Sequence, residues 1–432
     1  MKKVLKLGTR KSLLAWAQSS AVARRIESLN PGLEVHLVGI ETRGDVLLDV
    51  PLSSVPGKEF FVAEIDRALS VGQVDLTVHS MKDLSLERPA EFTCAAVPIR
   101  ENPRDVILFG PAAEAHLKAG IPLKIGTSSP RRLENIPSFL ERALPRLKPG
   151  GLPVLEFVEI RGNVNTRLSR VHEDPRSPKY LDGVVLAFAG LIRLWADAQG
   201  RGELVKLLKS IRWMILPLKE CPAAPAQGAL AVECRSRDLE TLACVQKIHH
   251  EETARHARLE RQVLADWGGG CHQRLGATAL NSTEWGDFMY LKGVQPTGME
   301  VDEIRWQVPD EDELDLGVQV RAWDGSDHRA ASIPWHFDLP LLENRSVFFA
   351  HSRAMTADPA HFKTSRIWTS GTKSWFKLAE RGLWVEGCAE SLGFKFLLPT
   401  LQEEVLQLGA LRDWFVLTHA GAENSWKNQA CT

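Results

Sequence analysis

Features that mark several other classes of protein are missing from this sequence. The 432-residue chain has no run of about 18 apolar residues, so we expect no transmembrane helix and no membrane partner. Its start, MKKVLKLGTRKSLLAWAQ, has a short basic stretch but lacks the long apolar core and the cleavage site of a signal peptide. We therefore predict a cytoplasmic protein.

An excess of one charge and paired cysteines are missing as well. With 53 basic and 54 acidic residues the net charge is −1, which gives no reason to expect a nucleic-acid partner. Any binding of anions must then depend on local clusters of basic residues. The seven cysteines are scattered without a CxxC pair, so the sequence predicts neither a zinc site nor a thioredoxin-like pair. Free thiols of this kind fit a reducing cytosol.

The chain is long enough for roughly three domains of about 100–150 residues each. Strand and helix signals alternate over residues 1–101 and again over 102–211. We predict two doubly wound α/β domains of the periplasmic-binding-protein type, the first completed by a returning segment at 212–235. A long helix over 239–267, followed by strand-like runs, predicts a small α+β domain at 236–330. Residues 341–432 form an additional α/β-like module.

Two motifs place polar residues where predicted strands end, which is where such sheets bind ligands. In GTRKS, Arg10 and Ser12 lie at a helix N-terminus, whose N–H groups and dipole favour an anion. In VHSMKD, Lys82 and Asp83 follow a buried strand, and the carboxylate can exchange protons or stabilise a cation. An ordinary cap and a solvated ion pair are the simpler interpretations of these two motifs.

Two further motifs are rich in arginine. GTSSPRR has adjacent Arg131 and Arg132 at a turn into a helix, and RGNVNTR has Arg161 and Arg167. The planar guanidinium binds a carboxylate through two hydrogen bonds, and adjacent arginines repel each other unless an anion neutralises them. The sequence therefore predicts an anion-binding cleft here, although solvated arginines on helices would give the same pattern.

Cys271 follows three glycines in GGGC, which leave room around the sulfur for a bulky adduct. A free cysteine is most often a buried packing residue, and that interpretation stays open here. A catalytic pair with His272 is disfavoured, because the side chains of sequence neighbours point apart. The pattern indicates an anchor for a covalent cofactor of unknown kind.

The order of the motifs along the chain resembles one enzyme family. The chain contains, in order, GTRKSLLAWAQ, PGKEFFVAEIDRAL, VDLTVHSMKDL, RENPRDVIL, IGTSSPRR, IRGNVNTRL, LAFAGLIRL, QGALAVECR and HHEETARHARLER followed by GGGC. Through these motifs, residues 3–300 resemble the hydroxymethylbilane synthases, also called porphobilinogen deaminases.

The resemblance implies a transferase that joins four porphobilinogen molecules with loss of ammonia and then releases hydroxymethylbilane by hydrolysis. It implies that Cys271 holds a dipyrromethane cofactor through a thioether. It also implies that Asp83 assists loss of the substrate amine and stabilises positive charge on the pyrrole nitrogens. The residues it assigns to the carboxylates of cofactor and substrate are Arg10, Ser12, Lys82, Arg131, Arg132, Arg161 and Arg167. Supporting hydrogen bonds are expected from Ser80, Thr127, Ser128 and Ser129.

The chain departs from the residues usual in this family at several positions. None of them carries chemistry in the assignment above, but the first lies in a loop expected near the active site and bears on substrate access. The departures are Glu59, Ser85, Pro130, Ala226 and Arg274.

Residues 345–432 exceed what such a synthase needs. Their strands, each ending at Ser, Thr or Gly before a helix, are similar to parts of uroporphyrinogen-III synthase, the next enzyme of the pathway, which we expect to receive the product. A bifunctional enzyme and a degenerate or structural module are both open interpretations. The non-enzymatic alternative is a carboxylate-binding solute-binding protein, which would have no use for GGGC. We expect a monomer that holds no metal.

Overall fold

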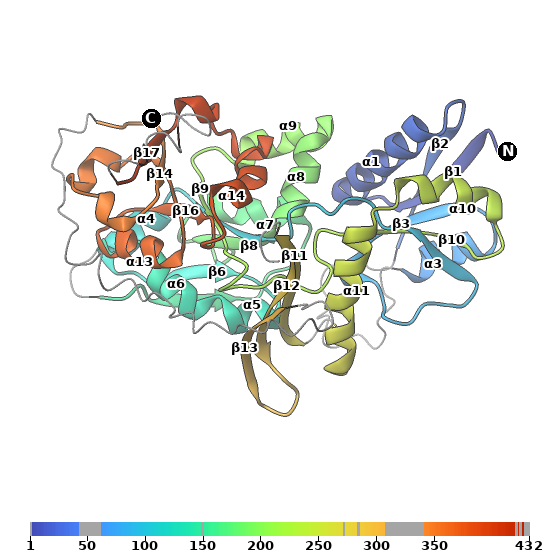
Figure 1. Ribbon diagram of the computed structural model, residues 1–432, viewed down its shortest axis with the longest axis horizontal. Coiled ribbons are helices and arrows are strands. Elements are labelled where there is room, and N and C mark those ends of the chain that lie inside the picture. The colour runs from blue at the N-terminus through green and yellow to red at the C-terminus, as the bar shows by residue number, and fades with distance from the viewer. Residues whose placement is uncertain are drawn as a thin grey trace, which may run out of the picture.

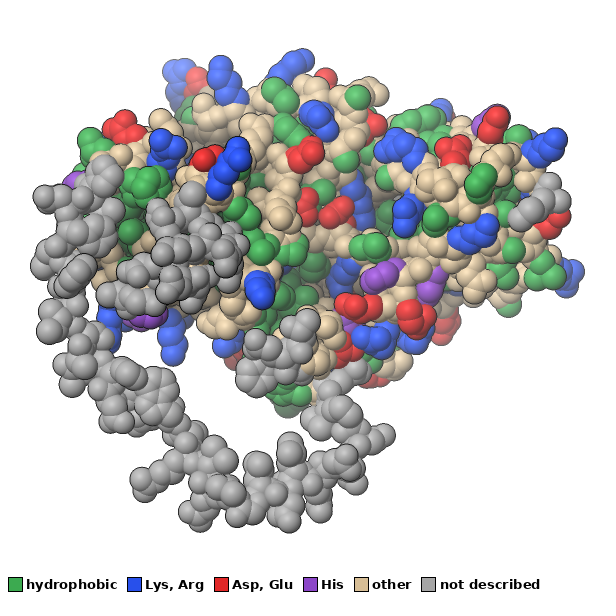
Figure 2. Space-filling view, turned by 45° about the horizontal axis from the view of Figure 1, so that its top comes forward, with side chains coloured by type: hydrophobic (Ala, Val, Ile, Leu, Met, Phe, Trp, Pro, Cys, Tyr) green, Lys and Arg blue, Asp and Glu red, His purple; other side chains and the backbone are tan. Residues whose placement is uncertain are grey.

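The computed structural model describes residues 2–42, 62–147, 151–270, 273–282, 286–306, 341–419, 422 and 426. These ranges form a mixed α/β fold with four sheets. The first sheet lies at one end of the molecule, the second near the centre and the C-terminal extension at the other end (Figure 1). Basic and acidic side chains alternate over the face in Figure 2, as the near-zero net charge implies. No helix in these ranges is long and apolar enough to cross a membrane.

The first sheet consists, in spatial order, of β2 (Glu34–Ile40), β1 (Val4–Arg10), β3 (Leu76–Ser80), β10 (Leu230–Arg235) and β4 (Phe92–Ala96). β1 runs parallel to β2 and β3, whereas β10 is antiparallel to both of its neighbours. Helix α1 (Leu13–Leu29) begins after Ser12, whose side chain accepts a hydrogen bond from the Ala15 N–H. Val22 on this helix joins Leu5 and Leu7 of β1 in one core, which α3 (Ala63–Ser70) flanks.

The second sheet consists of β7 (Leu155–Val158), β6 (Leu123–Gly126), β8 (Gly183–Ala187), β5 (Asp105–Phe109) and β9 (Arg212–Ile215). β6 is parallel to β7 and β8, and β5 is antiparallel to β8 and β9. Every residue of β5 is buried, as the uninterrupted apolar run after Asp105 predicts for a central strand. Its helices are α4 (Ala113–Ala119), α5 (Pro130–Asn135), α6 (Pro137–Ala143), α7 (Val164–Ser169), α8 (Phe188–Ala196) and α9 (Ala198–Leu207).

The returning segment differs from the predicted boundary. The prediction gave residues 212–235 to the first domain, but β9 lies in the second sheet, where Trp213 pairs with Leu108. Only β10 enters the first sheet. A short apolar strand such as RWMI fits either sheet, because its composition carries no information about its partner.

The third unit contains α11 (Glu251–Asp266) and an antiparallel sheet of β11 (Arg274–Ser282), β12 (Gly286–Val294) and β13 (Glu300–Trp306). The single long helix predicted over 239–267 is wrong. The chain forms α10 (Leu239–Val245) and a 3-10 turn, and α11 starts afresh after His250, which has an extended backbone. The His250 side chain caps α11 by accepting from the Thr253 N–H, so local capping starts a second, separate helix.

The extension has a parallel sheet of β16 (Val385–Cys388), β15 (Arg366–Thr369), β14 (Ser346–Phe349) and β17 (Phe415–Leu417), with helices α13 (Thr372–Glu380) and α14 (Phe394–Leu401). It lies beside the second α/β unit (Figure 1). The buried Trp375 packs edge-on against Phe139 at 5.2 Å, and its Nε1 donates to the Ala143 carbonyl. Trp384 Nε1 donates to the Trp213 carbonyl. The extension therefore shares one continuous core with the second unit.

Candidate active site

Asp83 lies on a short 3-10 turn, Met81–Asp83, that directly follows β3. The turn is held from behind, because the Met81 N–H donates to the Ala229 carbonyl at 3.0 Å. The Asp83 side chain is exposed, while Lys82 is half-buried and its Nζ donates to Gln227 Oε1 at 3.2 Å. The predicted catalytic carboxylate is thus accessible and sits on a fixed backbone.

The environment of Lys82 shows which charges share the site. Burial lowers the pKa of Lys82; the nearby Asp83 opposes this shift, whereas Arg132 and Arg131 reinforce it. The structure therefore brings both arginines of the GTSSPRR motif close to the Lys-Asp pair of the first domain. A bound anion would favour the charged ammonium and so oppose the effects of burial and of the two arginines.

Arg131 and Arg132 are buried, with side chains only 4% and 8% exposed, and both pair with Asp105. Arg131 Nη2 lies 2.8 Å from one carboxylate oxygen and Arg132 Nη2 lies 2.7 Å from the other. Burial disfavours the charge on Asp105, but the two guanidiniums outweigh this and hold its pKa well below its usual range. The anion that neutralises these adjacent arginines is therefore a side chain of the protein, Asp105, and not only a bound ligand.

Arg161, in the loop before α7, and Arg167, on α7 itself, face the same site. Burial lowers the pKa of Arg167 to about 10, and repulsion from Arg132 and Arg161 adds to this, while Asp83 acts in the opposite direction. Arg167 Nε donates to the Gly162 carbonyl at 2.8 Å, where φ of +104° favours glycine. Arg161 lies 3.6 Å from Glu159. The two predicted arginines therefore converge with the cluster around Asp105.

The Arg10–Ser12 turn lies opposite α7 and α8. A side chain added at Gly190 on α8 would lie 3.6 Å from Leu14 of α1 and 3.8 Å from Val164 of α7. The start of α1 therefore lies beside the starts of α8 and of α7, the helix that carries Arg167. Arg10 ends β1 and Ser12 precedes α1, so both lie on the side of the first domain that faces α7 and α8.

Three of the predicted hydroxyl groups form hydrogen bonds within the protein. Ser128 Oγ donates to the Ile160 carbonyl at 2.5 Å and accepts from the Ile160 N–H at 3.0 Å, which ties the GTSS loop to the strand end before Arg161. Thr127 Oγ1 accepts from the Ser129 N–H at 3.3 Å, and Ser80 Oγ accepts from Gln18 at 3.4 Å. These contacts shape the loops that carry the basic residues.

Three residues at the site were not predicted: Asp105, Gln227 and Arg261. Gln227 Nε2 donates to Asp105 Oδ1 at 2.9 Å while its Oε1 accepts from Lys82, so it links the two domains. Arg261 on α11 donates to the carbonyls of Met81 at 2.9 Å, Leu84 at 3.0 Å and Ser85 at 2.8 Å. The available signal was their place inside the motifs RENPRDVIL, QGALAVECR and HHEETARHARLER.

The predicted cofactor cysteine, Cys271, lies outside the described residues. The three glycines before it have φ values of +88°, +68° and +98°, a left-handed run that other residues rarely adopt. A side chain added at Gly269 would lie 3.1 Å from Leu86, three residues after Asp83. The glycine loop therefore passes close to the segment that follows the Asp83 turn.

The departures from the family pattern have structural explanations, except at Glu59, which lies outside the described residues. Pro130 occupies the first turn of α5, where its missing N–H costs nothing. Ser85 needs only its carbonyl, which Arg261 uses, and Arg274 forms an ion pair of 3.2 Å with Glu134. Ala226 is different, because it is buried with a left-handed φ of +60°.

One group in the described part of the chain has metal-ligand composition: Asp66, His79 and Glu233, with ligand atoms within 4.8 Å of one another. Arg88 already lies among the two carboxylates, at 2.8 Å from Asp66 and 2.7 Å from Glu233. Burial lowers the pKa of His79 to about 4, so it is neutral there. A guanidinium supplies the positive charge that a metal would bring.

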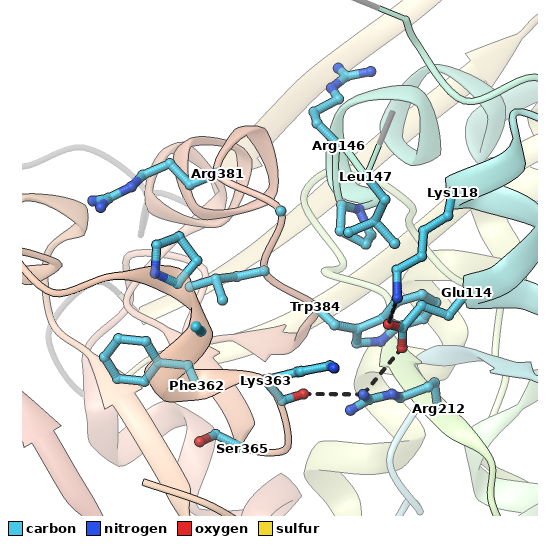
Figure 3. Close-up of a pocket in the computed structure, with 15 residues that line it drawn as sticks. Glu114, Lys118, Arg146, Leu147, Arg212, Phe362, Lys363, Ser365, Arg381 and Trp384 are labelled. Carbon is cyan, nitrogen blue, oxygen red and sulfur yellow. Dashed lines mark hydrogen bonds and ion pairs between the residues drawn. The ribbon is translucent and has the colours of Figure 1, made fainter. Parts of the chain in front are cut away.

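A cavity of about 330 Å³ lies between the second α/β unit and the extension (Figure 3). Two of its basic residues are already paired, since Lys118 and Arg212 both contact Glu114, at 3.0 and 3.3 Å. The side chains of Arg146 and Arg381 point away from its centre. It contains none of the residues predicted for the reaction.

Comparison with known proteins gives one consistent result. Residues 5–243 match the family model "Porphobilinogen deaminase, dipyromethane cofactor binding domain". Porphobilinogen deaminase of Syntrophus aciditrophicus is 35% identical over 74% of this chain and 95% of its own length. The enzymes of Syntrophotalea carbinolica and Geobacter sulfurreducens are 39% and 38% identical, over 64% and 67% of this chain and 78% and 80% of their own.

Among solved structures, the BenM effector-binding domain with benzoate is similar, with a TM-score of 0.30 and 13% identity, over 62% of this chain and 94% of that one. The methionine-binding protein MetQ has a TM-score of 0.30 and 12% identity, over 60% of this chain and 95% of that one.

Proposed function

The chain belongs to the porphobilinogen deaminase family, and from this premise we propose how its residues carry out the reaction. The protein is a transferase of tetrapyrrole biosynthesis that uses a dipyrromethane cofactor. It joins four porphobilinogen molecules with loss of ammonia and releases hydroxymethylbilane by hydrolysis. The family match favours this enzyme over the solute-binding protein that the sequence left open.

One observation carries the assignment of residues, namely the excess of positive charge around a single accessible carboxylate. Four cationic side chains act on one another and on two carboxylates, and one of those carboxylates, Asp105, is buried. The cationic residues are Lys82, Arg131, Arg132 and Arg167. Each pyrrole unit brings two carboxylates, so a growing chain needs this excess to remain bound.

The residues of the cleft fit a polycarboxylate cofactor. Arg131 Nε is buried and has no hydrogen-bond partner among the described residues, and a carboxylate oxygen would satisfy this donor. We propose that Arg10, Ser12, Lys82, Arg131, Arg132, Arg161 and Arg167 hold the acetate and propionate groups, with attachment through Cys271. When bound, dipyrromethane supplies the pyrrole to which substrate units are joined.

We propose Asp83 as the catalytic residue. Its side chain is exposed and lies beside the cationic cluster, where it can reach the substrate amine and the pyrrole nitrogens. There it takes part in proton transfer as ammonia leaves and stabilises the positive charge that develops on the ring, which is usually the largest catalytic contribution. Arg261 and Gln227 position it, since one fixes the backbone around it and the other fixes Lys82.

An intact-mass measurement tests the cofactor assignment. Protein from a host that makes porphobilinogen is expected to be heavier than its sequence by one dipyrromethane, and Cys271→Ser is expected to have the sequence mass and no turnover. Cys94→Ser, at an exposed thiol on β4, serves as the matched control and keeps the adduct. An adduct that persists in Cys271→Ser would exclude Cys271 as the anchor.

We further propose a cytoplasmic monomer that hands its product to uroporphyrinogen-III synthase. The arrangement of each central sheet, in which one strand returns antiparallel, supports two doubly wound domains of the periplasmic-binding-protein type. The four parallel strands of the extension support its similarity to one lobe of uroporphyrinogen-III synthase.

A further inference from the structure

Two crossover segments connect the first and second α/β units: residues 97–104, between β4 and β5, and residues 216–229, between β9 and β10. They lie side by side, because the Glu101 N–H donates to the Gly228 carbonyl at 3.1 Å and Arg100 Nε donates to the Gln227 carbonyl at 2.8 Å. One segment leads directly into Asp105, and the other carries Gln227. Their geometry therefore sets the distance between the Asp83 turn and the arginines.

The extension contacts both segments with one side chain. Glu390 Oε1 accepts from Arg104 Nε at 3.1 Å and from Arg104 Nη2 at 2.5 Å, and its Oε2 accepts from the Lys219 N–H at 3.0 Å. Arg104 belongs to the first segment and Lys219 to the second. A single carboxylate therefore crosslinks the two connections between the domains.

This contact is buried and is supported on both sides. Glu390 is 4% and Arg104 5% exposed, and the Arg104 guanidinium also lies 5.3 Å from the Phe396 ring. On the same helix as Phe396, Thr400 Oγ1 accepts from Asn102 Nδ2 at 2.9 Å. The extension thus holds the first segment at two successive points.

The backbone at Glu390 has an unfavourable conformation that directs its side chain toward the two segments. Glu390 and Ser391 have φ values of +55° and +65°, the left-handed region that costs about 1–2 kcal/mol per residue outside glycine. Such conformations persist only where surrounding contacts impose them. Here they turn the carboxylate from the end of β16 toward the crossover segments.

We propose that the extension, through Glu390, clamps the hinge between the two α/β domains, and that Glu390 is a positioning residue for the reaction. The inference rests on the proposed roles of Asp83 and the arginines, because these are the groups whose separation the hinge sets. A loose hinge would let the arginine cluster drift from Asp83, and displacements of about 1 Å reduce turnover by up to about 100-fold.

The test compares two buried glutamates of the full-length protein. Glu390→Gln removes the clamp, whereas Glu386→Gln breaks a buried ion pair inside the extension, where Glu386 accepts from Arg366 Nε at 2.6 Å. We expect Glu390→Gln to lower kcat about tenfold with KM for porphobilinogen changed less than about twofold. Both variants are expected to lower Tm, but Glu386→Gln keeps kcat within about twofold of the original.

Hydrogen exchange supplies a readout that does not depend on turnover. The Lys219 N–H donates to Glu390, so peptides covering 216–221 and 97–104 are expected to exchange faster in Glu390→Gln than in Glu386→Gln. Equal kcat and equal exchange in the two variants would overturn the proposal. If the unaltered protein did not convert porphobilinogen at all, the proposed function would be contradicted. The exchange rates of the two variants would still show whether Glu390 holds the two segments.

If Glu390→Gln does not fold, a milder variant tests the proposed clamp. Thr400→Val keeps the shape of the side chain and removes only the acceptor for Asn102. We expect kcat to fall about two- to threefold, with faster exchange confined to 97–104. Unchanged turnover and exchange in Thr400→Val would argue against a clamp.

Discussion

The two α/β domains contribute charge to the cleft in different ways. The first domain presents Asp83, exposed on a turn whose backbone is held by contacts from elsewhere. The second presents Arg131 and Arg132, which are buried and share the internal carboxylate of Asp105. The first domain keeps the carboxylate that we propose as catalytic accessible, while the second keeps positive charge in the interior, where its field is screened less by water.

The internal carboxylate of Asp105 explains how adjacent arginines can be buried and still provide positive charge for binding an anion. Two unpaired guanidiniums in the interior would be very costly, and Asp105 reduces their net charge to that of a single cation. The remaining positive charge acts on Lys82 of the first domain and on Arg167 of the second domain itself. Removing the exposed carboxylate should therefore affect rate, and removing the buried one should affect stability first.

The largest expected effect follows from Asp83→Asn. The amide keeps the size of the side chain but removes the charge that stabilises the cationic pyrrole, so we expect kcat to fall about 100- to 1,000-fold. Steady-state kinetics with porphobilinogen measures this, with the adduct confirmed by intact mass. Glu87→Gln, at an exposed carboxylate four residues later, is the control and should behave normally. Turnover within about threefold of the original in Asp83→Asn would remove Asp83 from the chemistry.

The next effect concerns the buried side of the comparison. Asp105→Asn leaves Arg131 and Arg132 without their counter-charge, so we expect the free energy of unfolding to fall by about 3–5 kcal/mol at neutral pH. Urea unfolding measures this loss. Because the pKa of Asp105 is held below its usual range, its contribution is fully present above about pH 4 and is lost as the pH falls further. The difference between the two proteins should therefore shrink only in strong acid.

A matched buried carboxylate separates this effect from simple loss of an aspartate. Asp182 accepts from the Tyr180 hydroxyl at 2.8 Å and lies 2.6 Å from His116 in the same domain, away from the cleft. Asp182→Asn should destabilise the domain without changing KM for porphobilinogen. If both variants raised KM equally, the Asp105 cluster would have no special part in the cleft.

A third prediction tests whether the Asp83 turn depends on the hydrogen bonds that Arg261 donates to its backbone carbonyls. Arg261→Lys replaces a planar fork that reaches three carbonyls with a single ammonium, and we expect kcat to fall about tenfold while the adduct is retained. Arg258→Lys, on the exposed face of the same helix, is the control. Equal activity of the two variants would show that the Asp83 turn holds its shape alone.

Helix caps and buried strands around the site were predictable from sequence, but the ion pairs between distant residues were not. Ser12 caps α1 and Asn163 caps α7 as their residue types predict, and the buried β5 follows from its apolar run. In contrast, Asp105 pairs with Arg132 at a separation of 27 residues, and nothing in either motif specifies the other. Charge repulsion between the arginines indicated an anion but not whether it would be a ligand or a side chain.

The extension shows the same limit at a larger scale. Its helices and strands could be located from sequence, but Trp375 and Trp384 read equally well as the core of an independent module. They instead pack into a core shared with the second domain. The hydrophobic effect is not directional, so the sequence of an apolar surface does not specify which other surface will cover it. Docking of this kind depends on the complete surfaces of both units, which local patterns do not contain.

The smallest expected effect comes from the connection between the two sides. Ala226, one residue before Gln227, has a left-handed φ of +60° and donates its N–H to Glu260 at 2.6 Å. Glycine adopts this conformation without strain but loses more entropy on folding, so we expect Ala226→Gly to stabilise the protein by about 0.5–1 kcal/mol. The urea midpoint measures this, and Ala229→Gly, in the same segment but with an ordinary φ, should destabilise instead. If Ala226→Gly also raised kcat, strain in this segment would be limiting the approach of Gln227 to Lys82.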